Sequence, residues 1–311
     1  MKITMNCMDA FNSVLGMQIE REGDELVSEG AELTITDKAG AVEGPTVTVG
    51  GEMSSSMLNM LDIVSATPVA CVSKWYDPFA GWMDQLVVSI PVMGMMNDDL
   101  GADVLSGMAL RYIDQSPLGE LFDNELLEMT LKQSKHTGFV SIGITPEGLA
   151  CSVCFGIPWG GNLVVLEGCG QRLAEFFSCP ERLMESWAVG LYVTRHPYPF
   201  ATVGERAHVE GLGRSTAKHI YTPHVTQYRN SFYTDNTMIA LCTSWDKRLI
   251  DANKRVLSLC GKITVEGKQH RTDLNSAVQR TWAILSNNGL INPVDSETSR
   301  PSRSLSAEPV S

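Results

Sequence analysis

One segment of the chain, residues 195–233, concentrates the side chains best suited to contact a negatively charged ligand. It holds five basic residues against two acidic ones, together with four of the six histidines. Six tyrosines and phenylalanines are interspersed among them. Lysine and arginine neutralise phosphates, and unpaired bases stack on aromatic rings. This combination therefore predicts contact with single-stranded nucleic acid.

The predicted contacts fall into two groups. In the first, phosphates would be bound by Arg206, Arg214, Lys218 and Arg229, and bases would stack on Tyr221 and Tyr228. The second is a basic stripe on a predicted helix from Asp235 to Cys260, formed by Lys247, Arg248, Lys254 and Arg255. These two basic pairs recur at a spacing of seven residues, and two helical turns return them to one side of the helix.

The charge along the chain is divided unevenly. Residues 1–190 contain nine basic and 26 acidic residues, whereas residues 191–311 contain 15 and ten. The net charge of −12 therefore combines −17 in the first part with +5 in the second. A basic part can contact an anion, or the acidic part of a second copy, while the acidic part keeps the chain in solution. This division favours a homo-oligomer.

Three candidate catalytic or metal sites compete with that hypothesis. A four-thiolate zinc site would use Cys151, Cys154, Cys169 and Cys179, although alternation along a strand places the first two on opposite faces. A cysteine nucleophile would be Cys169, which precedes a predicted helix, with His208 or His224 as its base. A metal site would be assembled by the fold from His196, His208, His219 and His224. These alternatives predict a cysteine- or metal-dependent hydrolase or transferase.

Nucleotide-binding motifs are absent from the sequence. The segment Cys260–Thr264 (CGKIT) lacks the first glycine of a phosphate-binding loop. Residues Gly211–Thr216 (GLGRST) offer backbone N–H groups and an arginine to a phosphate, as any flexible turn of this composition would. We predict neither a cofactor nor a bound metal.

The composition is that of a globular protein, with 43% hydrophobic and 19% charged residues in 311. The longest apolar run, Leu86–Met96, is interrupted by Pro91 and is shorter than the roughly 20 residues that a membrane helix needs. No apolar signal segment follows Met1. We therefore expect a cytoplasmic protein without membrane contact, whose eight cysteines stay reduced.

Hydrophobic periodicity predicts an α+β fold. Period-2 patterns predict N-terminal β-hairpins in residues 1–51, two strands in residues 68–92 and a central antiparallel meander of three strands in residues 138–168. Period-3.6 patterns and end signals predict helices at Ser54–Val64, Asp98–Tyr112, Pro117–Lys135, Asp235–Cys260 and Thr272–Asn288, with further helical material in residues 170–190.

These elements fit one interleaved domain over residues 1–292, with a possible soft division near residues 134–138 or 190 and a disordered tail at 293–311. The function that this sequence favours is a non-enzymatic, self-assembling protein whose basic second part contacts nucleic acid or an acidic neighbouring subunit. The alternatives are the hydrolase or transferase described above and a protein-binding module.

Overall fold

The computed structural model describes residues 3–6, 20–22, 25–27, 33–36, 46–48, 63–93, 106–114, 116–134, 136–158, 161, 163–165, 186–198, 200–201, 203–213, 219–222 and 224–293. Several expectations lie outside this part of the chain. They are nearly all of the helix predicted at Ser54–Val64, the first part of the helix predicted at Asp98–Tyr112, most of the helical material predicted in residues 170–190, and the tail predicted to be disordered after Pro293.

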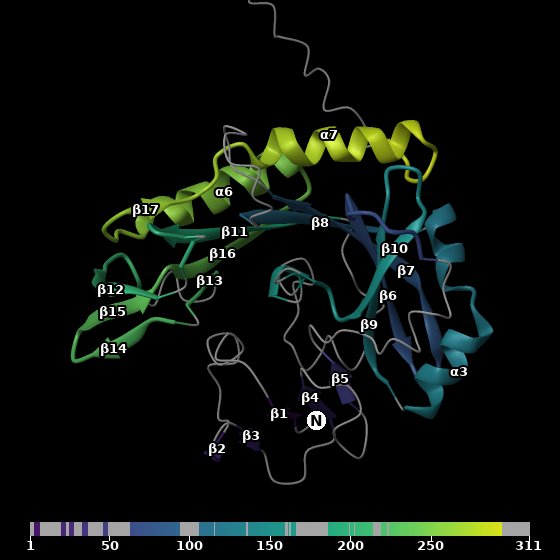
Figure 1. Ribbon diagram of the computed structural model, residues 1–311, viewed down its shortest axis with the longest axis horizontal. Coiled ribbons are helices and arrows are strands. Elements are labelled where there is room, and N and C mark those ends of the chain that lie inside the picture. The colour runs from purple at the N-terminus through teal and green to yellow at the C-terminus, as the bar shows by residue number, and fades with distance from the viewer. Residues whose placement is uncertain are drawn as a thin grey trace, which may run out of the picture.

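A nine-stranded sheet, antiparallel at every pairing, forms the centre of the molecule. Its order is β10-β9-β6-β7-β8-β11-β16-β13, with β17 paired to β11. The strands are β6 (Ala70–Asp77), β7 (Gly81–Val92), β8 (Gly107–Ile113), β9 (Gly138–Ile144), β10 (Ala150–Phe155), β11 (Trp187–Arg195), β13 (Ile220–Tyr221), β16 (Met238–Asp246) and β17 (Lys268–Gln269). In Figure 1, β6, β7, β9 and β10 run steeply, whereas β8, β11 and β16 lie nearly across the view, because the sheet twists strongly. The prediction of an α+β protein with a large antiparallel sheet is confirmed.

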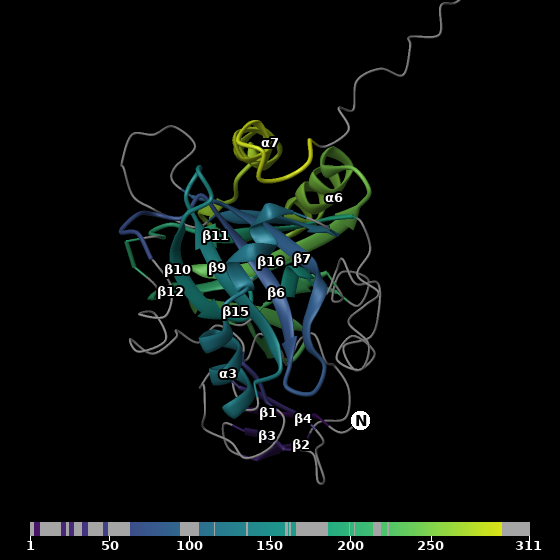
Figure 2. The same cartoon turned by 90° about the vertical axis from the view of Figure 1, so that its right-hand side faces the viewer.

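Helices α6 (Leu249–Lys262) and α7 (Leu274–Asn287) cover one face of β8, β11 and β16, as both views show (Figures 1 and 2). Helix α7 confirms the prediction at Thr272–Asn288, and Gly289 follows its end with a φ of 72°. That left-handed conformation suits glycine and terminates the helix. Arg111 of β8 lies over the rings of Trp187 and Trp282, 5.4 and 5.6 Å from their centroids, and so joins α7 to the sheet.

The helix predicted at Pro117–Lys135 is two shorter elements, the 3₁₀ helix η1 (Pro117–Phe122) and α3 (Glu125–Gln133). Ser116 caps the first, as expected, by accepting a hydrogen bond from the N–H of Leu118 at 3.1 Å. The side chain of Asn124 caps the second by accepting from the N–H of Leu127 at 3.0 Å. Asparagine offers the backbone this alternative to a continuous helix, so the chain starts a new helix there.

Three further predictions about elements were wrong. The C-terminal part of the helix predicted at Asp98–Tyr112 is strand β8, and the third strand of the predicted meander is helical at residues 163–165. Strands β9 and β10 do pair as predicted. The segment Trp187–Gly190, expected to be helical, opens strand β11.

The helix predicted at Asp235–Cys260 is the largest error. It is the end of β15 (Ser231–Asn236), the whole of β16 and most of α6. Residues 239–244 of β16 are buried on both faces of the sheet. A strand covered on both faces reads as a continuous apolar run, which periodicity alone does not distinguish from a buried helix.

A smaller N-terminal sheet has the order β2-β3-β1-β4-β5. Its strands are β1 (Ile3–Asn6), β2 (Glu20–Glu22), β3 (Glu25–Val27), β4 (Leu33–Thr36) and β5 (Thr46–Thr48). The hairpin β2–β3 matches the prediction. However, β1 pairs with β4 and β4 with β5 in parallel, so these pairs are not hairpins. Parallel strands need crossover connections, which short-range alternation does not indicate.

The core of the main sheet includes a chain of buried hydroxyl groups. Ser141 Oγ donates to the carbonyl oxygen of Gly156 at 2.5 Å. Ser73 Oγ and Ser141 Oγ are also 2.5 Å apart, so Ser73 must donate, because the proton of Ser141 is already used. Both serines are fully buried, and the network satisfies polar groups that would otherwise be costly there.

Neither proposed domain boundary coincides with a break in the sheet. Strand β9, which follows the first proposed boundary at residues 134–138, pairs with β6, which precedes it. Gly190, at the second proposed boundary, lies inside β11. The single-domain organisation itself stays a prediction. Within the described part of the chain, no helix is both long and apolar enough to cross a membrane.

Candidate functional site

The segment singled out from the sequence forms a small three-stranded sheet that extends from one end of the main sheet (Figure 1). Its order is β12-β15-β14, from β12 (Val203–Val209), β14 (Thr226–Tyr228) and β15 (Ser231–Asn236). Tyr233 of β15 lies opposite His208 of β12 and opposite Thr226 of β14. The topology therefore brings together His208 and Tyr233, which lie 25 positions apart in the sequence.

A cation and an imidazole flank Tyr233 on the exposed side of this sheet. The Arg206 guanidinium lies 4.6 Å from the centre of the Tyr233 ring, and the His208 ring lies 5.3 Å from it. Nδ1 of His208 is 3.4 Å from Oε1 of Glu210, and both side chains remain about half exposed or more, at 46% and 64%. Exposed contacts of this kind contribute little to stability, so this cluster is a polar surface of the sheet.

The other predicted residues of the first group do not join that cluster. Tyr221 is only 3% exposed in β13, so its ring cannot stack on an external base. Tyr228 is 59% exposed, and the guanidinium of Arg229 lies 5.4 Å from its ring centre. Arg214 and Lys218 lie outside the described residues.

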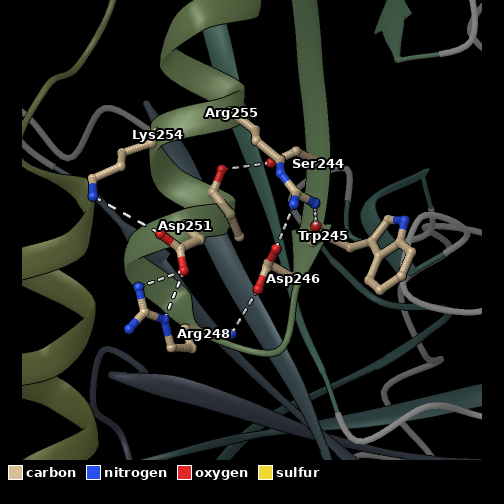
Figure 3. A network of polar contacts seen from close by, with 8 residues as sticks. Ser244, Trp245, Asp246, Arg248, Asp251, Lys254 and Arg255 are labelled. Carbon is tan, nitrogen blue, oxygen red and sulfur yellow. Dashed lines mark hydrogen bonds and ion pairs between the residues drawn. The ribbon is translucent and has the colours of Figure 1, made fainter. Parts of the chain in front are cut away.

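The predicted basic stripe is largely a network of ion pairs at the start of α6 (Figure 3). Arg248 contacts Asp251 through Nε and Nη2, both at 2.6 Å, and Lys254 Nζ is 3.8 Å from the same carboxylate. A hydrogen bond from Arg248, with help from the nearby cations, lowers the pKa of Asp251.

Arg255 contacts Asp246 at 2.7 Å and the carbonyl oxygen of Trp245 at 2.9 Å. Lys247 is exposed and precedes the helix, which begins at Leu249. The predicted stripe is therefore not a uniform basic face.

Two of the four candidate thiols and all four candidate histidines lie in the part of the chain that the structure describes. Cys169 and Cys179 lie outside it. Cys151 and Cys154 lie on β10, whose register shifts between Ala150 and Ser152, and this shift interrupts the alternation expected there. Burial raises the pKa of Cys71 well above its ordinary value, and the neighbouring Cys154 and Cys151 add to the effect.

Thiols with raised pKa are poor nucleophiles. Among the described residues, no group of three or more His, Cys, Asp or Glu side chains is arranged to hold a metal ion.

The residue that the sequence analysis missed is Arg195, at the end of β11. It was counted in the basic segment but not among the predicted contacts. Its side chain is 5% exposed. Nη2 donates to the backbone oxygen of Glu205, whereas Nε is buried and has no hydrogen-bond partner. Arginine is rarely buried without a partner, so the residue type by itself predicts exposure. No pattern in the neighbouring residues marks Arg195 as an exception.

Lys268 of β17, which lies opposite Arg195 in the β11–β17 pair, has hydrogen-bond acceptors for its ammonium group. Its Nζ donates to the carbonyl oxygens of Cys260 and Ile263, at 2.6 and 2.7 Å. These carbonyls lie at the C-terminal end of α6, where backbone acceptors lack helical partners and the helix dipole favours a positive charge. Lys268 therefore caps α6.

Replacing Lys268 with methionine should lower the free energy of unfolding by about 2 kcal/mol, because a hydrogen bond from a charged donor is worth roughly 1.5–3 kcal/mol. Urea denaturation measures the change. Lys254→Met is the matched control, since its Nζ makes only the exposed 3.8 Å contact with Asp251 and its loss should change stability little. Equal effects of the two substitutions would contradict the capping role.

No protein-family model matches the chain, and no curated protein resembles it in sequence. In fold it is similar to phosphoribosylamine–glycine ligase from Thermotoga maritima, with a TM-score of 0.50 at 15% identity over 68% of this chain and 56% of the ligase.

Two weaker similarities are to the biotin carboxylase domain of a thermophilic 2-oxoglutarate carboxylase and to phosphoribosylglycinamide synthetase from Anaerococcus prevotii. Their TM-scores are 0.44 and 0.41, at 10% and 8% identity; they cover 69% and 64% of this chain and 53% of each of the other two chains.

The similarity to a ligase corrects the function expected from the sequence. A non-enzymatic, self-assembling, nucleic-acid-binding protein is not the class of protein that this fold indicates. The site geometry agrees with the correction, because Tyr221 is buried and three cations of the predicted stripe face the carboxylates of Asp246 and Asp251. The charge division and the basic segment are real features of the sequence, but they do not establish a nucleic-acid interface.

Proposed function

We propose that this chain is an ATP-dependent ligase, or the part of one, that joins a carboxylate to an amine. The observation that supports the proposal is the similarity of its fold to phosphoribosylamine–glycine ligase. The chain covers 56% of the ligase's length.

The chemistry of such a ligase sets what the chain's own residues must do. A carboxylate and an amine condense only when the carboxylate is first activated, and transfer of a phosphoryl group from ATP achieves this. Enzymes accelerate phosphoryl transfer mainly by positioning the reactants and by placing cations where negative charge develops. The proposal therefore requires at least one cationic side chain that is held rigidly and still has a free donor.

The proposal predicts ATP consumption that depends on both partner substrates. We expect the purified chain to release ADP from magnesium–ATP when phosphoribosylamine and glycine are both present, at roughly 1 s⁻¹ or faster, which is the lower end of common turnover numbers. A coupled ADP assay measures the rate, and mass spectrometry identifies the amide product.

Two comparisons make this test specific. Leaving out glycine or the amine should reduce ADP release to the background level, and replacing glycine with other amino acids defines the carboxylate that is accepted. Arg255→Ala serves as a surface control, because Arg255 belongs to the exposed network at the start of α6, and it should leave the rate unchanged. Absence of substrate-dependent ADP release over a panel of amino acids and amines would rule out the ligase function.

A further inference from the structure

We propose that Arg195 forms a binding site for a small anionic group, a phosphate or a carboxylate, at the C-terminal end of β11. The side chain is 5% exposed, and its guanidinium makes one hydrogen bond, from Nη2 to the backbone oxygen of Glu205. Nε is buried and unpartnered. No carboxylate among the described residues forms an ion pair with Arg195.

A buried charge without a counterion is unfavourable, because the solvation lost on burial is not replaced. Arg271 shows what this protein does with a similarly buried arginine. It is 7% exposed, and it contacts both carboxylate oxygens of Asp273, at 2.5 and 3.2 Å. It also donates to the carbonyl oxygen of Met93 at 3.2 Å and to Ser106 Oγ at 3.1 Å. Arg195 lacks such a partner, so an anion from solution would supply what Asp273 supplies to Arg271.

The residues around Arg195 leave room for its guanidinium and add positive charge. A Cβ atom at Gly204 would lie 2.7 Å from Nη2, so the absence of a side chain there lets the guanidinium lie against the backbone of β12. Lys268, the cation that caps α6, is the residue opposite Arg195 in the β11–β17 pair. Glu205 contributes its backbone oxygen as the acceptor for Nη2.

The chemistry of guanidinium selects the ligand. Its planar fork of N–H donors matches two oxygens of a phosphate or a carboxylate, and such charge-assisted pairs are short and strong. The low effective dielectric of a buried site strengthens the bond further. The ligand is therefore the anionic group of a small molecule, or the free ion. This inference goes beyond the ligase proposal, because it concerns binding in the absence of ATP and of turnover.

The test follows the Nε–H group itself. Protein labelled with ¹⁵N-arginine is titrated with inorganic phosphate, with ribose 5-phosphate and, separately, with glycine, while the arginine Nε–H signals are recorded by NMR. The signals of Arg195 and Arg271 are assigned by triple-resonance experiments and checked with Arg195→Lys. We expect the Arg195 signal to shift saturably with at least one of the three probes, and the Arg271 signal to stay in place because its donors are occupied.

The choice of probe distinguishes the sources of the anion. Saturation by inorganic phosphate alone indicates a free ion, tighter binding of ribose 5-phosphate indicates a phosphorylated metabolite, and saturation by glycine alone indicates a carboxylate. Arg195→Lys should weaken the preferred probe by about tenfold, or 1.4 kcal/mol, since lysine has no bidentate fork. Arg255→Lys, at an exposed position, should not weaken it.

An Arg195 signal that none of the probes moves at concentrations of tens of millimolar would overturn the proposal. This readout uses the wild-type chain, so the test stands even where the Arg195→Lys variant does not fold. The NMR titration is also independent of ADP release. A chain that binds phosphate but has no ligase activity would contradict the proposed function and support the anion site. A chain with ligase activity whose Arg195 signal does not move would support the proposed function and contradict the anion site.

Discussion

Replacing Gly211 with alanine should lower the free energy of unfolding by about 4 kcal/mol. Gly211 follows β12 and has a φ of 85°, a left-handed conformation that costs an L-residue roughly 1–2 kcal/mol. A Cβ atom at this position would lie 1.8 Å from the carbonyl oxygen of Lys262 and 2.7 Å from its carbonyl carbon. Both are backbone atoms at the end of α6, so no side-chain rotation relieves the clash.

Relief would require moving α6 away from β12. The residues on either side of the contact, Glu210 and Thr264, exchange two backbone hydrogen bonds of 2.9 and 3.1 Å. Each is worth about 1 kcal/mol, and their loss adds to the conformational strain. Urea denaturation of the variant measures the sum.

Gly261→Ala is the matched control. Gly261 lies within α6, and a Cβ atom there meets nothing within 4 Å. Alanine favours a helix over glycine by about 1 kcal/mol, so this variant should be slightly more stable than the wild type. If Gly211→Ala were as stable as the wild type, the close approach of β12 to α6 would be refuted.

Acid should destabilise the protein through His136, by about 3 kcal/mol between pH 7.5 and 4. His136 is 4% exposed, its ring lies 4.5 Å from that of Phe155, and its Nε2 has no hydrogen-bond partner. Burial lowers the pKa of His136 from 6.5 to about 4, although interactions with the backbone of Phe139 and Gly138 act weakly in the opposite direction. Each unit of pKa corresponds to about 1.4 kcal/mol.

The direction follows from proton binding in the two states. Between pH 6.5 and about 4 the unfolded chain binds a proton at His136 and the folded chain does not, so stability falls as the pH falls through this window. Above the window the histidine is neutral in both states and contributes no pH dependence. Below pH 4 both states are protonated and the loss is complete.

Other groups titrate in the same range, so the prediction concerns a difference. Urea denaturation from pH 7.5 to 4 should show a smaller loss of stability for His136→Phe than for the wild type, by about 3 kcal/mol. His208→Gln, which removes a half-exposed histidine, is the control variant for the loss of an imidazole. Parallel pH profiles of wild type and His136→Phe would show that His136 does not titrate in this window.

Ligand chemistry was harder to predict than secondary structure, and Tyr221 and Arg195 show why. Both lie in the segment chosen for its basic and aromatic residues. Tyr221 is buried in the edge strand β13, so the ring predicted to stack on a base packs inside the protein. Arg195 is buried at the end of β11 without a counterion, so the residue with the greatest need of an anion was missing from the predicted contacts. Composition gives the types of side chain in a segment, whereas their exposure depends on which elements cover it.

The sequence alone determined those elements whose signals are local. Alternation and turn residues gave β6, β7, β9 and β10, and periodicity with terminal glycine gave α7, because these patterns depend on neighbours a few positions away. Only the tertiary structure decided the fate of Met238–Asp246, which is a strand because β11 and β13 pair with its two edges. The tertiary structure also placed three cations of the predicted stripe against the carboxylates of Asp246 and Asp251. It buried Arg195 beside Gly204 and left its Nε without a hydrogen-bond partner. Pairing, burial and charge compensation join residues that are distant in the chain, and local sequence does not encode them.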